Sequence, residues 1–179
     1  MGAWAEEKKQ GTDELLFTLP VSDLEVLLGK YFAVLKVYSV VLVFSLMHCL
    51  VLELIGDPDW GLIFSTYLGY WLAGCALLGA GMVASFLTNS STVAFVLAAL
   101  LCSIPVFIGN IPMPVALATI VGSDRLFEDL SLAQQFRPFG MGFIPLKGVL
   151  YFLSFAGFML YVNLVLIGQR HWSGGTRDA

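Results

Sequence analysis

The sequence predicts an all-α membrane protein in which four helices cross a bilayer after a short amphipathic segment. Four apolar runs are each long enough to cross the roughly 30 Å hydrocarbon core as helices, and they lie at residues 31–55, 62–87, 91–109 and 146–168. Charged residues make up only 12% of the 179-residue chain, against roughly 25% in ordinary soluble domains. The runs lack the ten-residue polar and apolar alternation of a β-barrel, so helices must satisfy the backbone in lipid.

The first predicted span covers residues 31–55, and an acidic turn with proline and glycine at 56–61 closes it. Lys36 and Glu53 lie near the two ends of this span, where long side chains can reach the membrane surface. His48 lies deepest, five residues from Glu53 and on a different helix face. This placement argues against a proton-relay pair, so all three polar residues are interpreted as structural.

The second span, residues 62–87, carries small side chains at spacings of three and four. Such spacing lets helix backbones approach one another closely in a membrane. Packing within the chain is the favoured interpretation, and a dimer interface is the alternative. The predicted packing residues are Gly69, Ala73, Ala76, Ala80 and Ala84, which Ala94 and Ala98 of the third span could meet.

A three-residue polar link leads to the third span, residues 91–109, which Pro105 should kink. The apolar stretch beyond Pro105 is broken by further prolines and is interpreted as re-entrant or interfacial. Residues 110–145 form a long external connection, 146–168 form the last span, and 169–179 form a tail.

The distribution of basic residues predicts the orientation. Three lysines precede the first span and two arginines follow the last one, whereas the turn at 56–61 has two aspartates and no basic residue. Basic residues favour the cytoplasmic side. We therefore expect residues 1–30 and 169–179 in the cytoplasm, with 56–61 and 110–145 outside.

Composition and motifs argue against several kinds of function. The three cysteines, Cys49, Cys75 and Cys102, lie in different spans and form no metal-binding or disulfide pattern. The chain contains no phosphate-binding loop and no hydrolase or metalloprotease motif. Its net charge of −4, without a basic run, gives no support for nucleic-acid binding. We predict no catalytic residue, no cofactor and no metal.

The segment before the first span contains two successive helix signals. Thr12 can cap a short helix with leucines on one face, which Pro20 ends. Ser22 and Glu25 then form a predicted capping box for a second helix running toward the membrane. The residues alone leave open a plain membrane-surface anchor or a docking element for a cytoplasmic partner.

Residues 6–31, EEKKQGTDELLFTLPVSDLEVLLGKY, resemble the ABC-2 type transporter permeases, closest to the gliding-motility and multicopper-enzyme-maturation branch. Further similar stretches lie at 56–60, 67–69, 135–139 and 146–154. Family members usually have six spans, two of them before this segment, so the resemblance implies that this chain lacks the first two. A non-transporting membrane scaffold or assembly protein is the alternative.

The resemblance also implies the partners of the chain. They are an ABC ATPase subunit that hydrolyses ATP in trans, a second permease subunit, and the lipid of a bacterial plasma membrane. The 1–30 segment would couple ATP hydrolysis to export. The residues that this resemblance implies as ATPase contacts are Glu7, Gly11, Thr12, Glu14, Leu15, Leu16 and Pro20.

Overall fold

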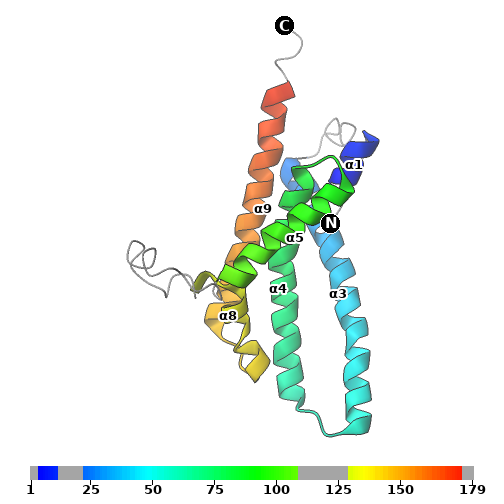
Figure 1. The fold of residues 1–179 in the computed structure, drawn as a ribbon, viewed down its shortest axis with the longest axis vertical. Helices are drawn as coiled ribbons and strands as arrows, with labels where there is room; N and C mark the ends of the chain where they lie inside the picture. Colours follow the sequence, from blue (N-terminus) through cyan, green and yellow to red (C-terminus); the bar gives the residue numbers. More distant parts are fainter. Residues whose placement is uncertain (1–3, 12–21, 109–128, 175–179) are drawn as a thin grey trace.

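A computed structural model describes residues 4–11, 22–108 and 129–174 of the chain, shown in Figure 1. The described residues form helices and connecting turns without any strand, which confirms the all-α prediction. The elements are α1 (Ala5–Gln10), α3 (Asp23–Ile55), α4 (Trp60–Phe86), α5 (Ser91–Phe107), α8 (Leu132–Phe136), the 3₁₀ helix η2 (Phe139–Met141) and α9 (Leu146–Gly174).

The four predicted spans overlap α3, α4, α5 and α9, but the four helices differ in length. Three of them, α3, α4 and α9, are long and apolar enough to cross a membrane. The fourth, α5, is apolar but has 17 residues, which at 1.5 Å per residue is about 25 Å. It continues past Pro105 and ends two residues later.

The α3 helix begins eight residues before the predicted span because a capping box starts it. The Ser22 N–H donates to Oε2 of Glu25 at 3.0 Å, and the Glu25 N–H donates to Oγ of Ser22 at 3.4 Å. The capping-box prediction is therefore confirmed. The Ser22 hydroxyl also donates to Oε2 of Glu25, at 2.8 Å, and this bond together with that of the Ser22 N–H lowers the pKa of the exposed Glu25 carboxyl, which lies ahead of the apolar run. With 33 residues, α3 is about 50 Å long and exceeds the hydrocarbon core.

The α4 helix is the centre of the bundle, with α3 on one side and α9 on the other (Figure 1). Of its most apolar stretch, 67% is buried inside the protein, against 22% for α9 and 6% for α3. The α3 surface is therefore left to the lipid or to another protein.

Small residues line the α4 surface that meets its neighbours. A Cβ added to Gly79 would lie 3.1 Å from Cβ of Met159 on α9, and the Asn163 amide nitrogen of α9 donates to the Gly79 carbonyl at 3.2 Å. Ala94 and Ala98 of α5 are fully buried as well. The five predicted packing residues are all buried within the chain: Gly69, Ala73, Ala76, Ala80 and Ala84.

The described part of the predicted external connection, residues 129–145, is folded onto α4 and α9. The Phe139 side chain is fully buried between two glycines. A Cβ on Gly69 or on Gly148 would lie 2.8 Å from a Phe139 atom. The Ser65 hydroxyl donates to the Phe143 carbonyl at 2.9 Å, and Lys147 pairs with Asp129 at 2.6 Å. The connection thus has structure that hydropathy alone does not indicate.

Candidate functional site

One end of the bundle brings together the short helix α1 and the ends of three longer helices. There the start of α3, the end of α4 and the start of α5 lie near α1, and α9 continues past them (Figure 1). The turn between α3 and α4 lies at the opposite end. Any force on residues 4–11 therefore acts at a place where the long helices meet.

The Trp4 side chain attaches this amino-terminal segment to the bundle. It is fully buried and meets the Phe86 ring edge-on, with ring centroids 5.5 Å apart. Leu27 and Tyr31 of α3 and Ile167 of α9 belong to the same apolar cluster. Burial of an indole ring contributes more apolar contact than most other side chains can, so Trp4 joins the segment to α3, α4 and α9 together.

The Ser85 hydroxyl of α4 caps the start of α1. Its Oγ accepts hydrogen bonds from the backbone N–H groups of Trp4 at 3.0 Å and Ala5 at 3.1 Å. The first N–H groups of a helix have no partner within that helix. Ser85 supplies the partner from a different part of the chain, in a fully buried position.

Charged and polar side chains complete the attachment. Lys30 of α3 forms an ion pair with Glu7 of α1, and its Nζ lies 4.5 Å from the centroid of the Trp4 ring in a cation–π contact. The Ser91 hydroxyl at the start of α5 donates to Oε2 of Glu6 at 2.8 Å. We call these residues the α1 anchor: Trp4, Glu6, Glu7, Lys30, Ser85 and Ser91.

Replacing Ser85 with alanine should loosen α1, because two buried N–H groups lose their acceptor. Leaving a buried donor unsatisfied costs about 1–3 kcal/mol. Hydrogen exchange of residues 4–11 should become faster, as measured by mass spectrometry in detergent. Ser154→Ala is the matched control, since the exposed Ser154 bonds only to a carbonyl of its own helix. Equal exchange in both variants would contradict the capping role.

The family match covers every residue of the α1 anchor. A model of the ABC-2 family transporter proteins matches residues 1–123, which is more than half of the chain. The chain belongs to the ABC-2 transporter family. It is a multi-pass membrane protein of the permease type. Neither a curated protein nor a solved structure matched it.

The predicted ATPase contacts of this ABC-2 protein fall into two groups. Glu7 and Gly11 are described: Glu7 pairs with Lys30 of the same chain, and the exposed Gly11 follows α1 with a φ of +69°. That positive φ favours glycine. The remaining predicted contacts lie outside the described residues: Thr12, Glu14, Leu15, Leu16 and Pro20.

The α1 anchor contains residues that sequence reasoning missed. Trp4 is the only aromatic residue in the first sixteen, and a lone tryptophan in a polar stretch is the one signal that could have indicated burial there. Lys30 entered the prediction through the orientation and as part of the 6–31 motif, and its contacts with Glu7 and Trp4 were not predicted. Ser85 lies among other small residues of α4, so nothing local distinguishes it.

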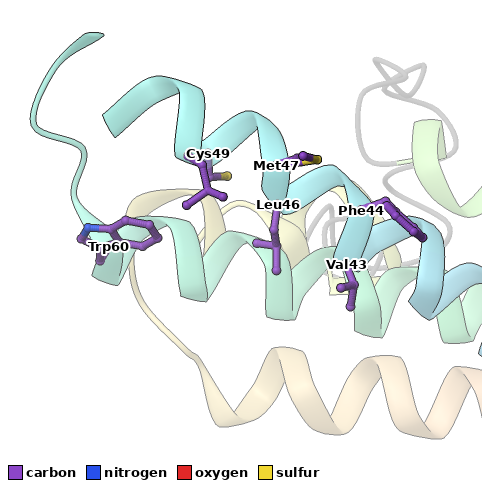
Figure 2. A pocket seen from close by; sticks show the side chains of 7 residues that line it. Val43, Phe44, Leu46, Met47, Cys49 and Trp60 are labelled. Carbon is purple, nitrogen blue, oxygen red and sulfur yellow. The ribbon is translucent and has the colours of Figure 1, made fainter. Parts of the chain in front are cut away.

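A second feature is an apolar groove between α3 and α4, toward the end far from α1. One cavity of about 380 Å³ includes Val43, Leu46 and Cys49 of α3 and Trp60 of α4 in its lining. Figure 2 shows Val43 and Leu46 directed toward α4. An adjoining cavity of about 450 Å³ shares three of these residues and extends to Trp71. The two helices are therefore not tightly packed along this stretch.

Within the described ranges, neither feature contains a cluster of metal-binding side chains. Among the described residues, no three histidine, cysteine or acidic side chains lie together in a way that could hold a metal ion. His48 is exposed on the surface of α3 and its Nδ1 lies 3.3 Å from the Ser45 carbonyl. The two features are thus an attachment point and a groove.

Proposed function

We propose that this ABC-2 protein is the membrane subunit of an exporter and that a separate ABC ATPase subunit docks on residues 4–30. The observation that carries the proposal is the α1 anchor. It fastens the amino-terminal segment to α3, α4 and α5 through side chains of each helix. A subunit bound to this segment could therefore pull or push on the spans.

The proposed docking surface centres on the residues that follow α1. Gly11, Thr12, Glu14, Leu15, Leu16 and Pro20 form the contact set, whereas Glu7 acts within the chain as the partner of Lys30. In this arrangement α1 is fixed on the bundle. Closure of the nucleotide-binding subunits would then move the start of α3 relative to α4.

The orientation and assembly follow from the same proposal. The α1 end of the bundle faces the cytoplasm of a bacterium, so both termini lie on that side of the plasma membrane. A second permease subunit, identical or related, completes the transporter. The largely exposed surface of α3 supports this, because only 6% of its most apolar stretch is covered within the chain.

Charge reversal in the docking segment tests the partnership. Glu14→Lys combined with Leu15→Asp and Leu16→Asp should abolish copurification of the ATPase subunit, because both the charge and the apolar face are reversed. Glu53→Lys is the control, since the exposed Glu53 lies on α3 near the opposite end of the bundle. Equal ATPase recovery from both variants would contradict the docking assignment. Absence of any ATPase, together with no ATP-dependent flux in vesicles, would favour the scaffold.

A further inference from the structure

The contact between α3 and α4 is a seam of hydrogen bonds. The Tyr31 hydroxyl donates to the Cys75 carbonyl at 2.9 Å, and the Tyr38 hydroxyl donates to the Tyr70 carbonyl at 2.8 Å. Seven residues further along α3, the Ser45 hydroxyl lies 3.0 Å from the Tyr67 hydroxyl. A spacing of seven keeps all three side chains on one face of the helix. Polar groups therefore hold much of this interface.

The closest approach in the seam lies at Gly74 of α4. A Cβ on Gly74 would lie 2.1 Å from Cε1 and 2.4 Å from Cζ of Tyr38. The Tyr38 ring therefore lies directly against the Gly74 backbone, and a larger residue at this position would have to displace the ring. This contact divides α3 into two parts.

The two parts of α3 are held very differently. Before Tyr38, Leu27 and Tyr31 are buried in the cluster that contains Trp4. Beyond Tyr38, Cys49 is the only buried residue of α3, and the apolar groove separates this part from α4. At its end, Leu54 is 86% exposed. The first part of α3 is thus set in the bundle core. The second part borders the groove and meets α4 through side-chain hydrogen bonds, in which the Trp71 indole N–H donates to the Ser39 hydroxyl at 3.0 Å and the Cys49 thiol donates to the Tyr67 hydroxyl at 3.5 Å.

We propose that α3 is a lever that pivots where Tyr38 crosses Gly74, so that movement at the α1 end opens or closes the α3–α4 groove at the other end. The docked ATPase would supply that movement, and this part of the proposal rests on the proposed function. The lever itself is a property of this chain. The helices α4 and α9 move together as its support, because Asn163 joins them at Gly79.

The hydrogen bonds of the seam suit such a pivot. Helix carbonyls such as those of Cys75 and Tyr70 already accept a bond from their own helix, so a departing hydroxyl leaves no carbonyl unsatisfied. In membrane proteins such side-chain bonds contribute modestly to helix association. Movement of the outer part of α3 away from α4 would break the Ser39–Trp71 and Ser45–Tyr67 bonds, which are of this modest strength.

Distance measurements between spin labels on the purified chain in lipid nanodiscs test the lever. With the native cysteines replaced by alanine, one label pair at Val51 and Phe64 reports on α3 and α4. A second pair at Phe64 and Leu150 reports on α4 and α9. All three sites are exposed. We expect a broader distance distribution for the first pair than for the second. Equal widths would overturn the lever.

Substitutions at the pivot provide the second arm of this test. Gly74→Ala should shift the Val51–Phe64 distances outward, because the methyl group displaces Tyr38. Gly81→Ala is the control on the same helix, since a Cβ there meets nothing within 4 Å. If Gly74→Ala does not fold, Tyr38→Phe keeps the ring, loses the bond to Tyr70, and should broaden the same distribution. Unchanged distances in the pivot variants would overturn the proposal. The nanodiscs contain no ATPase, so the outcome of these measurements does not depend on whether the docking proposal is correct.

Discussion

Replacing Trp4 with alanine is expected to cause the largest loss of stability among single changes at the α1 anchor. The side chain is fully buried, and truncation of a buried tryptophan typically costs about 3–5 kcal/mol. The variant also removes the ring under Lys30. Thermal unfolding in detergent, followed by circular dichroism, should show a clearly lower midpoint.

The control for this change is Trp60→Ala at the other end of the bundle. Trp60 is 49% exposed, so its loss leaves a smaller unfilled volume. Trp4→Phe should recover part of the stability, because an aromatic ring still fills the site beside Phe86. If Trp4→Ala unfolds at the same temperature as Trp60→Ala, Trp4 does not hold the segment on the bundle.

Replacing Ala80 with leucine is expected to disrupt the packing of α4. Ala80 is 1% exposed and belongs to the most buried of the long helices. Overfilling a packed site costs about 1–3 kcal/mol. The unfolding midpoint should therefore fall, and folded protein recovered from membranes should decrease.

The matched control is Ala99→Leu, which adds the same side chain at an exposed position of α5. This comparison also separates the two interpretations of the small residues. If Ala80 packs within the chain, the midpoint falls at every protein concentration. A variant that keeps its midpoint but loses dimers in size-exclusion chromatography would indicate a subunit interface.

The features that the sequence predicted well depend on nearby residues. The long helices follow from runs of apolar residues, which must be helical in lipid. The start of α3 follows from Ser22 and Glu25, three positions apart, so both members of the capping box are visible in one short stretch. The small residues of α4 likewise predict that this helix is buried.

The features that escaped prediction depend on distant residues. The six-residue helix α1 has neither the length nor the apolar face of a predictable helix, and its partners are on other helices. The fold of residues 129–145 similarly depends on Phe139 fitting against Gly69 and Gly148. Such contacts between separate segments leave no periodic signal along the chain.

The cap on α1 also has a consequence for the order in which the protein is built. An isolated helix of six residues is not stable in water, and the oxygen that caps α1 belongs to a residue made 81 positions after Trp4. The α1 helix therefore gains its cap only after α4 has been synthesised. The amino-terminal segment becomes ordered only on an assembled bundle, so a partner that requires an ordered α1 would distinguish finished molecules from nascent ones.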